Sequence, residues 1–354
     1  MSKTLTRTDT ELSYPDYLAN SHRPAFDGLR ALGFLLVITA HIPSVPFFGY
    51  LHGWSAVWMF FAMSGYLIAM LMMREERRIG RVAFGPFLVK RFCRIVPSYW
   101  MAILIYWLAC FTLELAPGDY ASFMARLPYY LAFLPEYADG NEFSIFTHSW
   151  TVGVELKFYL LFPPVLFLMI RNANWRFAVT AIIAVLLTMQ GSFNAQSYCA
   201  LLYGAMLAFA LERPQGYAFV ARLTRVPVVV PLAFIVALFA MLRYTEQLTA
   251  VAFVATYLMA YAIIRGAAMS RVLAWLPLVY LGQRSYGAYL LHFLAIRLGY
   301  LVFGDSTATG GLLTACFCLA ITVPAAELMY RAIELPVVDY GRRLLSGASS
   351  VSIR

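Results

Sequence analysis

Long apolar stretches alternate with short polar connections along nearly the whole chain. Most stretches approach the length of about 20 residues that an α-helix needs to cross a hydrocarbon layer. The pattern predicts about ten membrane spans, at Ala31–Tyr50, Trp54–Met73, Pro97–Ala116, Trp150–Ile170, Phe177–Gln190, Ser197–Leu211, Val226–Leu242, Thr249–Ile264, Tyr280–Phe303 and Gly311–Met329. We therefore expect an all-α fold, a polytopic membrane helix bundle.

Basic residues gather in the even-numbered connections between these stretches. The odd-numbered connections instead carry the acidic residues Asp119, Glu136, Asp139, Glu142 and Asp305. Because positive residues favour the cytoplasmic side, both termini are predicted to be cytoplasmic. The same alternation excludes a span at Tyr120–Tyr137. Pro128 and Pro135 interrupt that stretch, and we interpret it as an external interfacial or re-entrant segment.

Composition agrees with a membrane protein and limits its partners. Of 354 residues, 62% are hydrophobic and 13% are charged, which leaves too few polar groups to cover a soluble surface. The net charge of +9 mainly reflects orientation, so the expected partner is the lipid bilayer and not a nucleic acid. The five cysteines have no zinc or CxxC spacing, and no metal is expected.

The polar ends set the expected domain limits. Residues 1–22 have no apolar core before a cleavage site, so they are interpreted as a cytoplasmic tail and not as a signal peptide. Residues 23–340 form one membrane domain, and residues 341–354 form a second cytoplasmic tail.

His41 lies inside the first apolar stretch. Counting from Arg30 at the cytoplasmic face places it roughly 16 Å into the membrane, near the middle of the hydrocarbon layer. Pro43 and Pro46 follow and should end the regular helix early. A titratable group at this depth indicates a functional site, and a histidine hydrogen-bonded inside the bundle is the alternative.

Glu155 lies in the fourth stretch, at a depth of about 8–10 Å from the external face. It can therefore meet His41 at a similar depth, and a carboxylate beside an imidazole makes the imidazole a better general base. A purely structural ion pair of Glu155 is the alternative. Lys157, two residues further, points to another face of the helix, and its alternatives are chemistry, an interfacial cation or an internally paired cation.

Arg91 and Arg94 share a face near the cytoplasmic start of the third stretch, directly after Lys90. Two guanidinium groups at this spacing suit the oxygens of phosphate groups. The alternative is that cytoplasmic connections collect arginines in any membrane protein.

Two further segments bear on a substrate path. Tyr286, Tyr289 and His292 recur every three residues and would line one stripe of a helix. His292 either shapes the path or is a satisfied core histidine. Ser64 precedes Gly65 in a step that permits close helix approach, and no motif marks Ser64 as a nucleophile.

Together these segments resemble the acyltransferase-3 family of integral membrane acyltransferases. The resemblance runs from about residue 22 to residue 340 and rests on five motifs in family order. These are Phe26-Asp-Gly-Leu-Arg30 leading to His41, Phe60-Phe-Ala-Met-Ser64-Gly-Tyr-Leu-Ile68, Arg91-Phe-Cys-Arg94 with Ile95-Val-Pro-Ser-Tyr99, Trp150-Thr-Val-Gly-Val-Glu155 with Phe158-Tyr159-Leu160, and Ser285-Tyr-Gly-Ala-Tyr-Leu-Leu-His292.

The resemblance implies an enzyme that moves an acyl group, usually acetyl, from cytoplasmic acyl-CoA to a hydroxyl of an extracytoplasmic or lipid-linked glycan. His41 would be the general base and Glu155 its orienting or charge-stabilising partner. The phosphates of coenzyme A would be bound by Arg91, Arg94, Arg30 and Lys90. Ser64, Tyr159, Tyr286, Tyr289 and His292 would lie along the substrate path.

This implied enzyme would be a multi-pass protein of a bacterial-type cytoplasmic membrane, with acetyl-CoA as co-substrate and no tightly bound cofactor. A homo-oligomer is compatible with the sequence. The chain departs from the family pattern at Gly153, where Ser is common, and at Leu156 and Lys157, where many members have Glu and Gln. The rival hypothesis is a proton-coupled transporter or flippase of a lipid-linked sugar, which would use His and Glu as relays. No inverted repeat supports it.

Overall fold

The computed structural model describes residues 11–19, 23–113, 115, 118–138, 144–243, 248–265 and 272–351. Every regular element in this part of the chain is helical, which confirms the all-α prediction. The chain divides into two compact units. Unit 1 comprises Met1–Val37, Tyr50–Val82 and Phe162–Gln283, and unit 2 comprises Ile38–Gly49, Ala83–Leu161 and Arg284–Arg354.

The helices follow one another in the order of the predicted stretches, and the division between units falls within α2, α7 and α14. The bounds in the first half are α1 Tyr14–Ala19, α2 Pro24–Ala40, α3 Pro46–Gly49, η1 Gly53–Ser55, α4 Ala56–Ile79, α5 Phe84–Leu113, α6 Asp119–Leu131, η2 Pro135–Tyr137, η3 Thr147–Ser149, α7 Trp150–Pro163 and η4 Pro164–Leu168. The remaining bounds are α8 Ala173–Gln190, α9 Phe193–Leu211, α10 Pro214–Leu223, α11 Val229–Leu242, α12 Leu248–Ile264, α14 Leu276–Phe303, α15 Ala308–Met329, η5 Tyr330–Glu334 and α16 Leu335–Val351.

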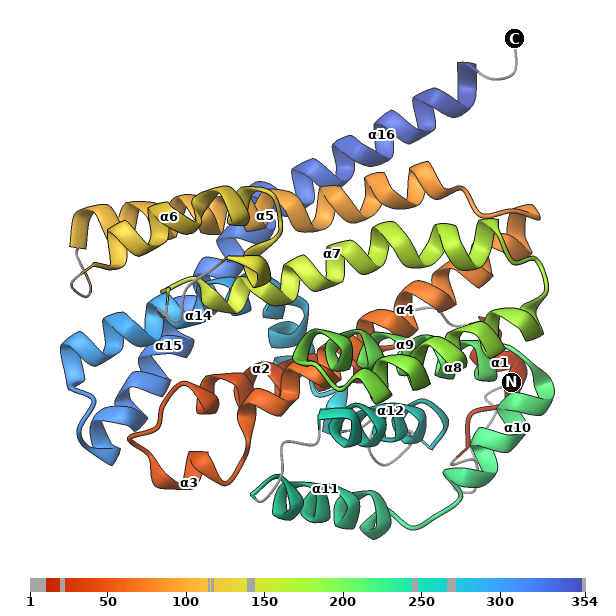
Figure 1. Cartoon of the computed structure of the whole chain (residues 1–354), viewed down its shortest axis with the longest axis horizontal. Helices are drawn as coiled ribbons and strands as arrows, with labels where there is room; N and C mark the ends of the chain where they lie inside the picture. The colour runs from red at the N-terminus through yellow and green to blue at the C-terminus, as the bar shows by residue number, and fades with distance from the viewer. Residues whose placement is uncertain are drawn as a thin grey trace, which may run out of the picture. The chain divides into compact units, whose positions relative to one another are not determined.

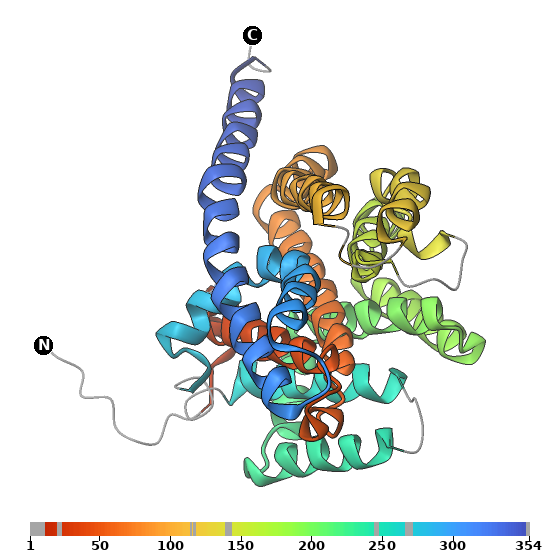
Figure 2. The same ribbon diagram turned by 90° about the vertical axis from the view of Figure 1, so that its left-hand side faces the viewer.

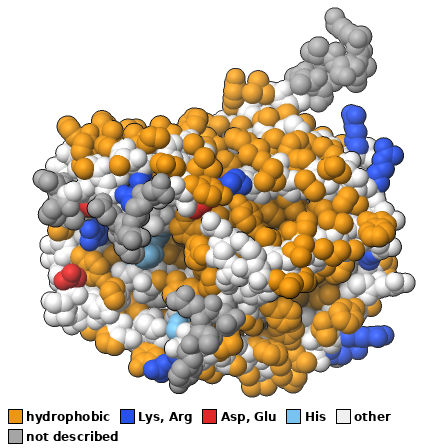
Figure 3. Space-filling view, in the orientation of Figure 1, with side chains coloured by type: hydrophobic (Ala, Val, Ile, Leu, Met, Phe, Trp, Pro, Cys, Tyr) orange, Lys and Arg blue, Asp and Glu red, His pale blue; other side chains and the backbone are white. Residues whose placement is uncertain are grey.

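Six helical stretches among the described residues are long and apolar enough to cross a membrane. They are Gly53–Ile79, Phe84–Leu113, Thr147–Leu168, Ala173–Gln190, Leu276–Phe303 and Ala308–Leu345. Two further apolar helices, α11 and α12, are shorter. Apolar side chains cover most of the face shown in Figure 3, as expected for a surface in contact with lipid. The chain is thus a multi-pass membrane protein, while the count of about ten spans and the side of the termini stay predictions.

The segment predicted to be interfacial or re-entrant contains the short helix α6 and the single turn η2. Neither belongs to the candidate spans of the described residues. Asp139 and Glu142, which helped to define this connection, lie outside the described residues.

Unit 1 is organised around α9, which packs against α4, α8 and α12 (Figure 1). A Cβ atom built on Gly65 of α4 would lie 1.8 Å from the Leu201 carbonyl oxygen, and one built on Gly204 of α9 would lie 1.8 Å from the Ala62 carbonyl oxygen. Only glycine permits this approach of two backbones. The close contact predicted at the Ser64-Gly65 step is therefore confirmed.

The N-terminal segment is part of unit 1. The Leu12 N–H donates to the Ile264 carbonyl at 2.9 Å, the Tyr14 hydroxyl donates to the Glu212 carbonyl at 2.7 Å, and Arg74 donates to the Tyr17 carbonyl at 3.1 Å. Residues that sequence interpretation assigned to a tail thus connect the ends of α4, α9 and α12. These ends belong to connections that the charge pattern assigns to one side of the membrane.

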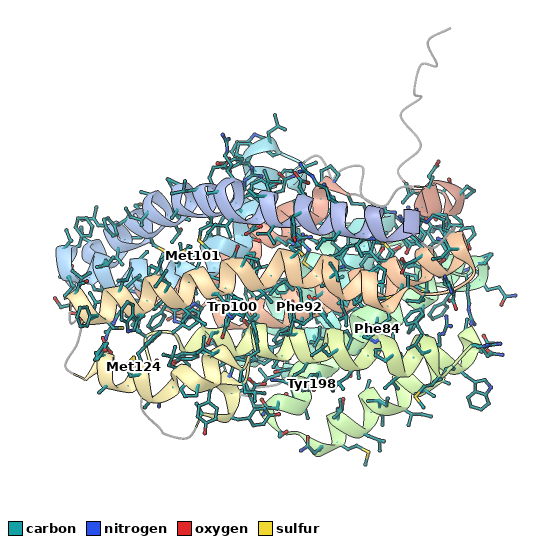
Figure 4. The ribbon with its side chains drawn as sticks, turned by 90° about the horizontal axis from the view of Figure 1, so that it is seen from above. Phe84, Phe92, Trp100, Met101, Met124 and Tyr198 are labelled. Atoms are coloured by element: carbon teal, nitrogen blue, oxygen red, sulfur yellow. The ribbon has the colours of Figure 1, made fainter. Side chains whose placement is uncertain are left out.

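Unit 2 is organised around α5, which packs against α6, η5 and α16. Figure 4 shows α5 along its length, with Phe84, Phe92, Trp100 and Met101 labelled on it and α16 beside it. The chain continues from α15 through η5 into α16 without leaving the helix, and Figure 2 shows these elements as a long rod that leads to the C-terminus.

Candidate active site

His41 directly follows the last residue of α2. Pro43 and Pro46 come next, and α3 starts at the second proline, so the early helix end predicted from these prolines is confirmed. The Tyr300 hydroxyl donates to the His41 carbonyl oxygen at 3.4 Å. The His41 carbonyl, which lies just past the end of α2, thus has a hydrogen-bond donor from within unit 2.

Three histidines from distant segments lie together in unit 2. The ring centroids of His41 and His292 are 5.2 Å apart, and those of His292 and His148 are 4.8 Å apart. His292 lies on α14 and is fully buried, whereas His148 lies in η3 and is 6% exposed. The structure thus brings the predicted His292 next to His41 and adds His148, which sequence reasoning did not single out.

Backbone carbonyls determine the neutral tautomers of the two buried imidazoles. The Nε2 atom of His148 donates to the Leu290 carbonyl at 3.0 Å, and the Nδ1 atom of His292 donates to the Tyr289 carbonyl. Because a carbonyl only accepts, the remaining nitrogen of each neutral ring is an acceptor. The Nδ1 atom of His148 is buried and has no hydrogen-bond partner among the described residues. The His148 ring can therefore receive a proton or a hydroxyl donor at this atom.

Aromatic side chains surround the histidines. Phe293 lies 5.0 Å from His41 edge to face, and Tyr289 lies 5.2 Å from His292. The Tyr289 hydroxyl donates to the His148 carbonyl at 3.2 Å. Tyr289, predicted to line a substrate path, thus holds the η3 turn beside His292.

Glu155 lies on α7 and contacts a different set of residues. Tyr159, one turn later, donates to its Oε2 atom at 3.2 Å. The Tyr159 ring lies 5.8 Å from the guanidinium carbon of Arg91, which also interacts electrostatically with Glu155. Among the described residues, the ring neighbours of His41 are His292 and Phe293, so a direct pairing of His41 with Glu155 stays a prediction.

A buried carboxylate accompanies Arg94 as well. Glu334 ends the π-helical segment η5, is 8% exposed, and accepts a hydrogen bond from the Ser98 hydroxyl at 3.0 Å. It interacts electrostatically with Arg94 and Arg284. Glu334 was not predicted from the sequence, although a carboxylate at the end of a long apolar run was a usable signal.

Tyr286 lies within electrostatic range of both carboxylates. Its hydroxyl donates to the Ile95 carbonyl of α5 at 2.9 Å, and it interacts electrostatically with both Glu155 and Glu334. The predicted stripe on α14 therefore serves two places, with Tyr286 at the arginine pair and His292 at the histidine cluster.

Of the remaining predicted residues, Lys90 adjoins the arginine pair, whereas Arg30 and Ser64 belong to unit 1. Lys90 is exposed on α5, one residue before Arg91. Arg30 belongs to unit 1, where it forms an ion pair of 3.4 Å with the buried Asp27. Ser64 is also in unit 1 and is buried in α4. No group of three or more His, Cys, Asp or Glu residues that could hold a metal occurs in the described part of the chain.

Comparison with known proteins identifies the class to which this fold and site belong. The family model described as an acyltransferase domain, that of the acyltransferase-3 family, matches residues 23–331. The chain therefore belongs to the acyltransferase-3 family.

Individual relatives match most of this chain in sequence. The chain is similar to O-acetyltransferase OatA of Staphylococcus aureus strain NCTC 8325 / PS 47, with 27% identity over 90% of this chain and 57% of the relative. It is also similar to the putative O-acetyltransferase SAR0937 of strain MRSA252, with 24% identity over 95% of this chain and 61% of the relative. The chain thus spans about three fifths of the length of these relatives. No solved structure matches it.

Proposed function

We propose that the protein is a membrane O-acyltransferase of the bacterial cytoplasmic membrane. It transfers an acyl group, acetyl by our interpretation, from cytoplasmic acyl-CoA to a hydroxyl of an extracytoplasmic or lipid-linked glycan. The observation that carries the proposal is the family match over residues 23–331, and the names of the two relatives support O-acetyl transfer. The geometry of unit 2 supports the assignment of roles.

His41 acts as the general base for the acceptor hydroxyl. It takes the hydroxyl proton while the hydroxyl oxygen bonds to the acyl carbon. The bond from that carbon to sulfur breaks, and the proton finally neutralises the coenzyme A thiolate. His292 lies next to His41, and His148 lies next to His292, so a proton on His41 has neutral imidazoles close to it.

Glu155 stabilises the protonated base from a distance. It interacts electrostatically with Tyr289, whose ring packs against His292. A negative charge at this position favours the imidazolium form over the neutral form.

Arg91 and Arg94 bind the phosphates of coenzyme A, with Lys90 next to them, and Arg30 is a further candidate. Each guanidinium can bind a phosphate through two N–H groups. Glu155 and Glu334 compensate the two cations when no donor is present.

Binding of coenzyme A to the detergent-solubilised full chain tests the donor assignment. Arg91→Ala and Arg94→Ala should each weaken the binding of acyl-CoA and of free CoA alike, because the contact is to the carrier and not to the acyl group. Lysine at either position should restore binding only in part, since it keeps the charge and loses the planar fork. Absence of CoA-dependent thermal stabilisation of the wild type at millimolar ligand would reject the donor site and favour the transporter hypothesis.

A further inference from the structure

Gly153 and Lys157 of α7 contact the same segment of unit 2. Gly153 and Lys157 are four residues apart on α7 and share a face, which is turned away from Glu155. Both contact the segment Phe133–Tyr137 that follows α6.

The segment approaches α7 more closely than a side chain at position 153 would allow. A Cβ atom on Gly153 would lie 2.7 Å from the Phe133 carbonyl oxygen and 2.8 Å from the Oε2 atom of Glu136. Phe133 itself has φ of +59°, a left-handed conformation that is costly for a residue with a Cβ atom. In this conformation the Phe133 carbonyl accepts a hydrogen bond from Lys157 Nζ at 3.3 Å.

An ion pair fastens the same segment. The Lys157 ammonium contacts the Glu136 carboxylate, and their side chains are only 19% and 6% exposed. This confirms that Lys157 is an internally paired cation. Ion pairs shielded in this way gain little over apolar packing, but they impose one geometry. The ion pair therefore fixes the position of the segment Phe133–Tyr137 more than it adds to the stability of the fold.

Tyr137 is the residue that the Lys157–Glu136 ion pair orients. The Lys157 ammonium lies 5.2 Å from the centre of its ring, while the residue is 54% exposed. An exposed aromatic ring that contacts an ammonium group on one face offers a rigid apolar surface with a hydroxyl at its edge. Pyranose rings pack their C–H groups on such faces, and the charge pattern assigns this segment to the external side.

We propose that Tyr137 is a binding platform for a sugar ring of the acceptor, positioned by Lys157, Glu136 and Gly153. The inference rests on the proposed function, which supplies the glycan acceptor. Lys157 and Glu136 are positioning residues, because they act through Tyr137 and do not touch the reacting atoms.

Kinetics of the full chain in lipid nanodiscs tests the platform. Labelled acetyl-CoA serves as donor, and chitotriose, maltotriose and cellotriose serve as probe acceptors. For the trisaccharide that the wild type uses, Tyr137→Ala should raise the acceptor KM about tenfold, with kcat and the KM for acetyl-CoA unchanged. Tyr137→Phe should keep a near-normal acceptor KM. Tyr340→Ala, which alters another exposed tyrosine on α16, is the matched control and should change nothing.

The ion pair is tested by reversing it. Lys157→Glu and Glu136→Lys should each raise the acceptor KM, and the double variant should recover most of the loss. An unchanged acceptor KM in Tyr137→Ala, or equal KM changes for donor and acceptor, would overturn the platform. If instead the wild type neither binds CoA nor transfers acetyl groups to any probe, the proposed function itself fails.

Discussion

Arg176 provides the most direct test of what holds unit 1 together. It lies in the first turn of α8, is 2% exposed, and contacts the Glu76 carboxylate of α4 through both terminal nitrogens, at 2.5 and 2.7 Å. Its Nε atom donates to the carbonyls of Leu166 and Ile170, at 3.1 and 2.7 Å, where the π-helical end of η4 leaves acceptors without helix partners. One side chain thus connects α4, η4 and α8.

Arg176→Met keeps the apolar stem and removes all four polar contacts. Breaking a buried ion pair by deleting one partner costs about 3–5 kcal/mol. Glu76 is 32% exposed and can recover some water, so we expect the lower end, about 3 kcal/mol. At roughly 2–4 °C per kcal/mol for a domain of 150–250 residues, the midpoint of thermal unfolding should fall by about 6–12 °C.

The assay is thermal unfolding of detergent-solubilised protein, monitored by fluorescence-detected size exclusion. Arg176→Lys should recover part of the loss, because an ammonium cannot reach the carboxylate and both carbonyls at once. Arg342→Met is the matched control, since Arg342 is 70% exposed and pairs with Asp339 within one turn. Equal midpoints for Arg176→Met and Arg342→Met would refute the reasoning.

Three further predictions concern the base, the pH dependence and the orientation. His41→Ala should lower acetyl transfer by about 10²–10⁴-fold while the protein still inserts, and near-normal turnover would exclude His41 as the base. Burial raises the pKa of Glu212, and the nearby Arg77 and Arg74 partly oppose this effect. Glu212 therefore contributes its full stabilisation below its ordinary pKa, which applies in the unfolded chain. This stabilisation is lost as the pH rises through the pKa of the folded state. The unfolding midpoint of the wild type should therefore decline as the pH rises above the ordinary carboxyl pKa of 4.5, and it should decline more than that of Glu212→Gln; parallel curves would contradict this. Single cysteines at Gly80 and Arg222 in a cysteine-free background should be protected from an impermeant thiol reagent in intact cells, whereas cysteines at Asp139 and Asp305 should react; external labelling at Gly80 would invert the orientation.

Local sequence signals predicted the elements of this fold well. Apolar run length located the helices, and Pro43 and Pro46 located the break after His41, because both depend on residues adjacent in the chain. Gly65 indicated a close helix contact for the same reason, since only the lack of a side chain matters there.

Long-range partners were much less accessible to sequence reasoning. His148 and His292 are 144 residues apart, and only the packing of η3 against α14 brings their rings together. The partner of Lys157 is Glu136, on a segment interrupted by Pro128 and Pro135, where neither helical nor strand periodicity fixes which side chain faces α7. Sequence spacing predicts which residues share one face of a helix. Which residues of other elements pack against that face is determined by the tertiary structure.

The arrangement of charges in unit 2 also explains how a membrane segment retains two arginines near its first turns. A cation in hydrocarbon is costly unless it has a partner or water. Arg91 has Glu155 and the rings of Phe87 and Tyr159 near it, and Arg94 has Glu334. Each arginine therefore has a carboxylate from a different helical element, so the pair is compensated before any ligand binds. In the proposed function, a phosphate that approaches this pair would compete with the two carboxylates for the positive charge of the guanidinium groups, and donor binding would weaken the interaction of Glu155 with Arg91. In the proposed function, Glu155, which also interacts electrostatically with Tyr289 beside the histidines, would couple donor binding at the arginine pair to the charge that stabilises His41 as the base.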